Sequence, residues 1–271
     1  MAPAPFLTGC LGETTQSPEE VTPSSDDWKK RADAAIQETR TTDLSVTVED
    51  ATGTSVPDAS VDITMQAHEF CFGTAVNAVS LIDRSEEGDP YRSHLDELFN
   101  TAVLENYHKW NNWESESKRA IANSATEWLL KRGLDVRGHA VLWQRLDNNT
   151  VPDDVVTKVN SDDSDQAEYL TERTTDHTWN IVDEYAGEIT EWEILNEHVD
   201  NHDITEAITP NVPPQQSTQV ADWFWTAKDA SPEADFYVNE YNLIAGEYED
   251  HRTTLEELVQ YLQYRDAPID G

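Results

Sequence analysis

The sequence is short of cysteine, of long apolar runs and of positive charge. Two cysteines in 271 residues cannot build a disulfide framework or a multi-cysteine zinc site. No apolar run approaches the roughly 20 residues that span a bilayer, so no transmembrane helix is predicted. Lys and Arg number 18 against 54 Asp and Glu, which gives a formal net charge of −36. Nucleic-acid binding is therefore excluded, because phosphate contacts need clustered Lys and Arg.

Two nucleotide-binding motifs are also missing. No Gly-x-Gly-x-x-Gly follows the first predicted strand of the main domain, and no Gly-x-x-x-x-Gly-Lys-Ser/Thr occurs. A dinucleotide-binding fold has no support, and we expect no cofactor. Apolar residues nevertheless make up 37% of the chain, with nine Trp and nine Tyr, which is enough to build a core.

The negative charge is spread along the chain instead of forming one block. A net charge of −36 far exceeds the roughly 2–8 units typical of a small soluble domain. Concentrated salt screens such self-repulsion within a few Å. An acidic binding tail, the alternative, would place the charge in one segment. We therefore expect a protein adapted to high salt.

Residues 1–27 read as a disordered leader or tether, rich in Pro, Ser, Thr and Glu. Within it, the segment Leu7-Thr8-Gly9-Cys10 resembles a lipobox, in which Cys10 becomes lipidated. The apolar stretch before Cys10 is short and no positively charged segment precedes it, so an incidental cysteine in a disordered tail is the alternative. The lipobox interpretation predicts an extracellular protein, lipid-anchored to the outer face of the membrane. Cys71, between Phe70 and Phe72, is expected to be buried.

Residues 28–69 predict a helix followed by a small β unit. Trp28, Ala32 and Ile36 fall on one face of a helix over residues 26–40. Two alternating apolar and polar runs, residues 44–48 and 61–65, then flank a turn at Thr52-Gly53, as two half-buried strands would.

From residue 70 onward, short apolar strands alternate with amphipathic helices. The predicted strands cover residues 70–77, 99–105, 134–143, 189–196 and 235–241. The predicted helices cover residues 89–98, 115–132, 165–186, 217–230 and 250–264. Such alternation predicts βαβ units and a parallel sheet, hence the α/β class. Polar or aromatic residues follow each strand, at the end that carries the chemistry of a (β/α)8 barrel.

Five segments on successive strands carry a further pattern: residues 70–77, 99–110, 137–143, 192–197 (Trp-Glu-Ile-Leu-Asn-Glu) and 239–242 (Asn-Glu-Tyr-Asn). Together they resemble the family 10 glycoside hydrolases, which are chiefly endo-β-1,4-xylanases. The resemblance covers about residues 70–271. It implies a (β/α)8 TIM barrel, of which about five to five-and-a-half units are present, and retaining hydrolysis of xylan or xylo-oligosaccharides.

The resemblance also implies roles for individual residues. Glu197 would be the general acid/base, which needs a pKa raised toward neutrality. Asn196 would hydrogen-bond the 2-hydroxyl of the sugar at the cleavage site, and His139 would lie under that sugar. The neighbouring sugar would contact Glu105, Asn106 and Lys109, and the aromatic residues Trp143 and Tyr241 would line the site. Gln144 stands where many xylanases have His, which affects the finer specificity.

The second carboxylate of a retaining enzyme has no counterpart in the sequence. In the family this nucleophile is a Glu at the end of the seventh strand, whereas residues 267–271 match the opening of the sixth. We therefore expect a truncated chain that is inactive on xylan alone. The alternative is a non-catalytic carbohydrate-binding protein, or a decayed one anchored to the surface by lipid.

A metal site is a further hypothesis. His198 and His202 have the i, i+4 spacing that suits zinc on a helix, and Asp200 and Asp203 lie beside them. These residues follow the fourth predicted strand and fall in a predicted loop, where an acidic chain gathers such clusters by chance. We therefore predict that these residues bind no metal ion.

Overall fold

The computed structural model describes residues 25–66, 70–244, 246 and 248–271. The chain divides into two compact units, Met1–Met65 and Gln66–Gly271. Cys10, the predicted lipidation site, and nearly all of the predicted leader lie outside the described residues. Within the described part, no helix is both long and apolar enough to cross a membrane.

In the first unit the predicted helix forms, but the predicted β unit is wrong. Helix α1 spans Ser25–Thr39. The two apolar runs after it form no strand and do not pair with each other. An isolated antiparallel bridge joins Glu49 and Ser55, which lie between the runs. The apolar side chains of both runs are exposed except that of Val48, which is half-buried. The reason is that two strands alone bury too little apolar surface to be stable in water, however well the side chains alternate.

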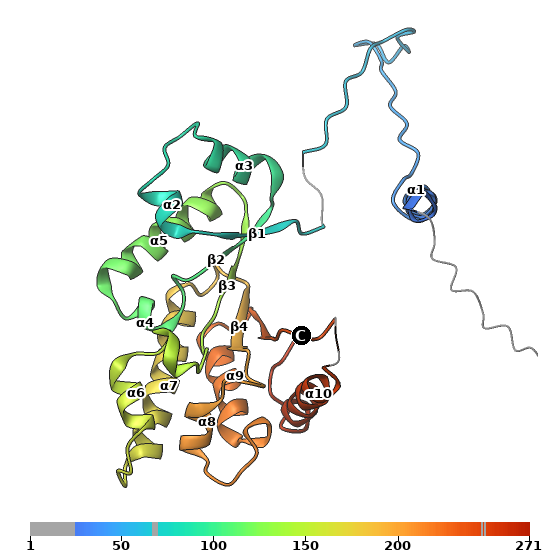
Figure 1. The fold of residues 1–271 in the computed structure, drawn as a ribbon. Coiled ribbons are helices and arrows are strands. Elements are labelled where there is room, and N and C mark those ends of the chain that lie inside the picture. The colour runs from blue at the N-terminus through green and yellow to red at the C-terminus, as the bar shows by residue number, and fades with distance from the viewer. Residues whose placement is uncertain (1–24, 67–69, 245, 247) are drawn as a thin grey trace, which may run out of the picture. The chain divides into compact units, whose positions relative to one another are not determined.

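The second unit confirms the predicted fold class, a partial (β/α)8 barrel (Figure 1). Five strands lie in parallel, in the order in which they occur in the chain. They are β1 (Gly73–Val76), β2 (Thr101–Leu104), β3 (Asp135–Gly138), β4 (Glu191–Asn196) and β5 (Asp235–Asn239). Each falls inside a predicted strand, but the ends are shorter than the sequence suggested.

All five predicted helices of this unit form. They are α3 (Pro90–Leu98), α5 (Glu116–Lys131), α7 (Gln166–Glu184), α9 (Thr218–Ala230) and α10 (Glu249–Tyr264). Six shorter helices were not predicted: α2 (Ala78–Ile82), α4 (Trp110–Trp113), α6 (Asp153–Val159), α8 (Asp203–Ile208), η1 (Leu146–Asn148) and η2 (Pro214–Gln216). A helix of three to seven residues is too short to show a helical apolar period, so the sequence gives little sign of it.

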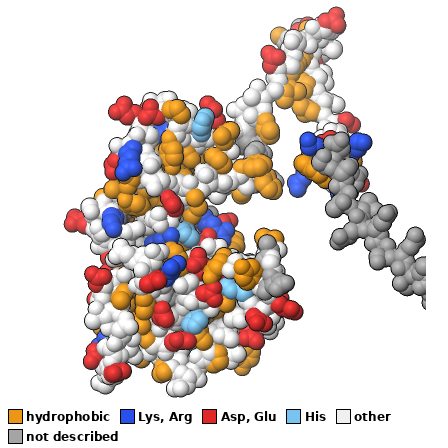
Figure 2. All heavy atoms as spheres, in the orientation of Figure 1, with side chains coloured by type: hydrophobic (Ala, Val, Ile, Leu, Met, Phe, Trp, Pro, Cys, Tyr) orange, Lys and Arg blue, Asp and Glu red, His pale blue; other side chains and the backbone are white. Residues whose placement is uncertain are grey.

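The core lies between the sheet and its helices. Its largest fully buried side chains include Trp110, Trp192, Trp223, Phe224 and Phe236. Cys71 does not join this core: it is exposed, contrary to the prediction, because it lies in the segment before β1, where Phe70 and Phe72 are exposed too. Acidic side chains are spread over the visible face instead of forming one block (Figure 2).

Two irregularities of the sheet bear on the site. In the pairing of β4 with β5, Glu193 opposes Tyr237 but Leu195 opposes Val238, so Ile194 is an extra, bulged residue. At the outer edge of β5, the amide of Asp270 donates to the carbonyl of Phe236 at 2.8 Å, and the amide of Val238 donates to the carbonyl of Gly271 at 3.0 Å. The last residues therefore continue the sheet beside β5.

Candidate active site

Glu197 is the residue directly after β4. Its amide donates to the carbonyl of Asn239 at 2.8 Å, and its carbonyl accepts the amide of Asn201 at 2.9 Å. Its backbone φ is 52°, in the left-handed region that a residue with a Cβ rarely adopts. The carboxylate is thus carried by a tight turn fixed to both β5 and the following loop, and it is half-buried.

Asn196, the last residue of β4, is buried and faces β5. Its Oδ1 accepts a hydrogen bond from the Nδ2 of Asn239 at 2.7 Å. Because Oδ1 is engaged, the amide group of Asn196 is oriented, and its Nδ2 is left to donate elsewhere. Asn239 was quoted in the sequence comparison but given no role there.

Lys109 brings the next group of predicted residues together. Its Nζ donates to the Oδ1 of Asn106 at 3.1 Å and lies 4.6 Å from the centre of the Trp143 ring. Burial lowers the pKa of Lys109, while the negative charges of Glu105, Glu197 and Glu193 raise it. The ammonium group is therefore within electrostatic reach of three carboxylates: Glu105 directly after β2, Glu193 in β4 and Glu197 directly after β4.

His139 is held by a carboxylate that the sequence reasoning missed. Its Nδ1 lies 2.6 Å from the Oε2 of Glu193, which is only 7% exposed. The other oxygen of Glu193 accepts the Nε of Arg137 at 3.0 Å. With Nδ1 engaged by the carboxylate, the Nε2 of His139 is the ring nitrogen left for another partner.

Tyr241 lies beside Glu197 at the end of β5. Both residues line an open pocket of about 380 Å³, together with Arg145, Leu146, Asp147, Asp200, Asn201 and Asp203. The hydroxyl of Tyr241 donates to Asp200, and this bond raises the pKa of Tyr241 to about 12. Asp200 is a second residue of the site for which the sequence analysis offered only a metal-binding role.

Glu105 and Glu240 are the other carboxylates at these strand ends, and both are engaged. Glu105 accepts a hydrogen bond from the Nδ2 of Asn77 at 3.4 Å. The side chain of Glu240 is 1% exposed, and it accepts the amide of Val199 at 3.0 Å. The Nε2 of His251 also lies 3.2 Å from Glu240, close enough for an ion pair but not aligned as a hydrogen bond.

The four residues of the metal hypothesis do not converge. The Nδ1 of His202 donates to the carbonyl of His198 at 3.1 Å, and its Nε2 lies 3.3 Å from Glu206. Asp200 is bonded to Tyr241 and Asp203 begins α8. Across the described residues, no three His, Cys, Asp or Glu side chains are grouped to hold an ion.

Asn77 and Glu193 differ in how far the sequence points to them. Asn77 follows β1, as the other site residues follow their strands, so position alone was a signal. Glu193 gave none, because strict alternation backward from Asn196 places it on the opposite face. The bulge at Ile194 removes that difference: Glu193 opposes Tyr237 and Asn196 opposes Asn239, and those two β5 residues share a face.

Comparisons with known proteins agree with this fold. The family model described as "Glycosyl hydrolase family 10" matches residues 60–271. Endo-1,4-beta-xylanase A of Halalkalibacterium halodurans is 28% identical over 225 residues, which cover 75% of this chain and 51% of that protein. Anti-sigma-I factor RsgI6 of Acetivibrio thermocellus is 24% identical over 265 residues, which cover 90% of this chain and 29% of that protein.

Among solved structures, a GH10 protein from Paenibacillus barcinonensis superposes with a TM-score of 0.61 at 22% identity. It covers 74% of this chain, and this chain covers 58% of it. Xylanase 10B from Thermotoga maritima gives a TM-score of 0.58 at 22% identity, with the same coverage. The chain therefore spans between about a third and three-fifths of the length of these relatives.

Proposed function

Because the chain belongs to glycosyl hydrolase family 10, we propose that it carries the acid/base half of a retaining endo-β-1,4-xylanase acting on xylan. The relatives named endo-1,4-beta-xylanases support this substrate class. The observation that carries the proposal is the gathering of Glu197, Lys109 and Trp143 at the carboxyl ends of parallel strands. In a (β/α)8 barrel, that is the face where chemistry takes place.

In this proposal Glu197 protonates the leaving glycosidic oxygen and later deprotonates the attacking water. Asn196, whose Oδ1 is fixed by Asn239, donates its Nδ2 to the 2-hydroxyl of the sugar at the cleavage site. Lys109 and Asn106 hold the neighbouring sugar by hydrogen bonds, and Trp143 packs against its C–H face. Charge-assisted hydrogen bonds of this kind contribute roughly 1.5–3 kcal/mol each.

The second carboxylate is the part that we propose these 271 residues do not supply. A retaining glycosidase needs it about 5–5.5 Å from the acid/base. We assign this role to neither Glu105 nor Glu240, because Glu105 follows β2 among the sugar contacts and the side chain of Glu240 is only 1% exposed. The chain by itself should therefore bind xylo-oligosaccharide without turning it over.

Binding and turnover are tested separately with the purified chain. Xylohexaose binding is measured by calorimetry in concentrated salt, and reducing sugar released from xylan measures turnover. We expect Lys109→Met to weaken binding about tenfold or more. Lys228→Met is the matched control, because Lys228 also lies near an aromatic ring, 5.6 Å from that of Phe236, but on helix α9 and not among the strand-end residues.

Each outcome bears on a different part of the proposal. Absence of xylohexaose binding, or equal weakening by the two lysine variants, would refute the sugar site. Turnover of xylan by the chain alone, lost in Glu197→Ala, would show that the second carboxylate is present after all.

A non-catalytic carbohydrate-binding protein is the second candidate function. It is favoured by the assembly of Lys109, Asn106 and Trp143, because these groups can bind a sugar whether or not a nucleophile is present. An extracellular location with a lipid on Cys10 also belongs to the proposal. Mass spectrometry of the mature amino terminus tests it: a diacylglyceryl group on Cys10 supports the anchor, and an intact Met1 opposes it.

A further inference from the structure

We propose that Gln144 is a positioning residue for the acid/base Glu197. It holds His198 as the neutral ring with its proton on Nε2, and through His198 it fixes the turn that carries Glu197. The inference rests on the proposed function for the role of Glu197 as acid/base. The hydrogen bonds that support the inference are independent of that function. Gln144 itself is not a sugar contact, because it is 1% exposed beneath the site.

The orientation of the Gln144 amide follows from Thr205. Its Oε1 lies 2.8 Å from the amide of Thr205 and 3.0 Å from the Oγ1 of that residue. A backbone N–H can only donate, so the atom facing it is the oxygen and not the NH2 group. The opposite orientation would place two donors against each other. Gln144 therefore presents its NH2 group on the other side.

That NH2 group faces His198. The Nε2 of Gln144 lies 3.3 Å from the Nδ1 of His198. Because the amide nitrogen is a donor without a lone pair to offer, Nδ1 must accept, and the proton of the neutral imidazole must be on Nε2. The tautomer of His198 is thus determined by a chain of two contacts that starts at the backbone of α8.

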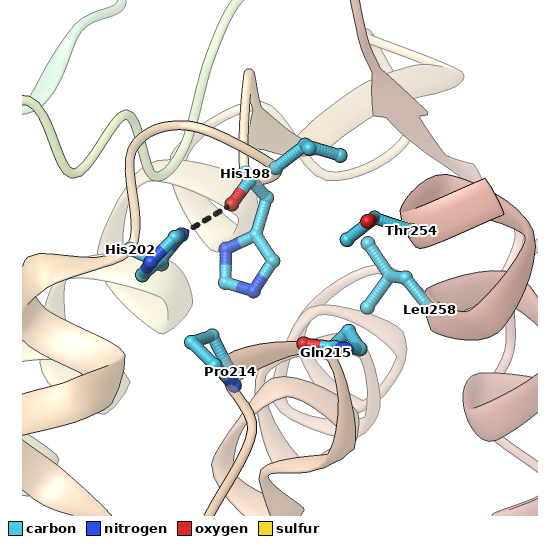
Figure 3. Close-up of a pocket in the computed structure, with 7 residues that line it drawn as sticks. His198, His202, Pro214, Gln215, Thr254 and Leu258 are labelled. Atoms are coloured by element: carbon cyan, nitrogen blue, oxygen red, sulfur yellow. Dashed lines mark hydrogen bonds between the residues drawn. The ribbon is translucent and has the colours of Figure 1, made fainter. Parts of the chain in front are cut away.

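The rest of the His198 environment fits this form. The ring is 2% exposed and points into a cavity of about 40 Å³ lined by His202, Pro214, Gln215, Thr254 and Leu258 (Figure 3). Burial and the charge of His202 lower the pKa of His198 and the carbonyl of Pro214 raises it, which together leave it at about 4. A cavity of this size has room for a water molecule that could accept from Nε2–H.

His198 is covalently next to Glu197, which links the network to the site. Glu197 has a φ of 52°, and such a strained residue persists only where its surroundings hold it. The strand β5 holds one side of the turn, through the carbonyl of Asn239. Gln144, six residues beyond the end of β3, holds the other side through the His198 ring. The structure thus braces Glu197 from both neighbouring strands.

The test measures the tautomer first and the turn second. In ¹⁵N-histidine-labelled chain, we expect the NMR shifts of His198 at pH 7 to show a protonated Nε2 and an unprotonated Nδ1. Gln144→Glu keeps an oxygen for Thr205 but turns an acceptor toward Nδ1. We expect it to move the proton to Nδ1 and to raise the protonation constant of His198 at least tenfold.

The control is the exchange Gln215→Glu/Glu257→Gln. Gln215 donates to Glu257 at 2.9 Å, so the exchange can keep that hydrogen bond while it places a carboxylate on the cavity wall without a contact to Nδ1. It should leave the proton on Nε2. The turn is followed by hydrogen exchange of the Asn201 amide, which is bonded to the carbonyl of Glu197. We expect hydrogen exchange at least tenfold faster in Gln144→Glu and unchanged in Gln215→Glu/Glu257→Gln.

Three results decide between the possibilities. A wild-type His198 with its proton on Nδ1 overturns the inference, and so does unchanged Asn201 exchange in Gln144→Glu. If that variant does not fold, Gln144→Met, of similar volume and uncharged, takes its place in the exchange measurement. If the tautomer and the hydrogen exchange behave as expected but no form of the chain binds xylohexaose, the proposed function fails. The positioning of the Glu197 turn by Gln144 would still hold.

Discussion

The contact between β3 and β4 leaves no room for a side chain at Gly138. A Cβ built there would lie 2.0, 2.3 and 2.4 Å from three atoms of the Trp192 ring, far inside van der Waals contact. The ring of Trp192 is fully buried, and the rings of His108 and Tyr185 are centred 5.7 and 6.1 Å from it. Trp192 can therefore yield to Gly138→Ala only by displacing its own neighbours.

The expected cost follows from that overlap. Overpacking of a well-packed core destabilises by about 1–3 kcal/mol and occasionally more. We expect Gly138→Ala to reach at least about 3 kcal/mol, because three ring atoms overlap the new Cβ at once. At roughly 2–4 °C per kcal/mol for a domain of this size, the unfolding midpoint should fall by about 6–12 °C.

Thermal and urea unfolding, followed by circular dichroism, measure this cost. Gly73→Ala is the matched control in β1, where a Cβ would lie 3.6 Å from the nearest atoms of Thr101, an ordinary contact. It should change stability by no more than about 0.5 kcal/mol. The loss of stability in the double variant Gly138→Ala/Trp192→Leu should be smaller than the sum of the losses in the two single variants. Equal effects of the two glycine substitutions would refute the packing argument.

Three further predictions concern the pH dependence of stability, sugar binding and the salt dependence of stability. Burial lowers the pKa of His177 to about 3. Between about pH 3 and pH 6.5 the unfolded chain therefore binds more protons than the folded chain. The free energy of unfolding decreases as the pH falls through that range. Urea unfolding measures the free energy of unfolding of wild type and His177→Gln at pH 7 and pH 5. The decrease between these pH values should be about 2 kcal/mol smaller in the variant, and equal decreases would contradict the lowered pKa of His177. Trp143→Ala should weaken xylohexaose binding about tenfold in calorimetry while Trp143→Tyr keeps most of it, and an unchanged affinity in the alanine variant would remove Trp143 from the site. With a net charge of −36, the urea midpoint should rise between 0.1 M and several molar KCl, and a flat salt dependence would contradict salt adaptation.

The sequence was most informative where an element is long or is covered by another layer. Helix α7 and strand β4 were found because each keeps its apolar pattern over several residues and packs in the core. The runs at residues 44–48 and 61–65 show an equally clear alternation, yet they form no strand. Alternation records that one face is apolar, but whether a strand forms depends on what lies against that face, which local sequence does not tell.

The candidate site shows the same limit at the level of single residues. Lys109 and Trp143 were named from the resemblance, and the structure brings them into contact. Glu193 was missed because a bulge changes which face a residue occupies, and a bulge leaves no mark in an apolar pattern. Gln144 was considered for specificity, but its buried amide contacts two other residues of the protein instead.

The left-handed backbone at Glu197 has a consequence for the evolution of the fold. A residue with a Cβ in that region costs roughly 1 kcal/mol relative to glycine, which adopts it freely. Replacing Glu197 by Gly, or by Asn, should therefore raise the thermal stability while abolishing any acid/base function. A lineage selected only for persistence of the fold would lose this glutamate readily. Its retention in a relative would thus be a sign that the chemistry, and not the architecture, is still under selection.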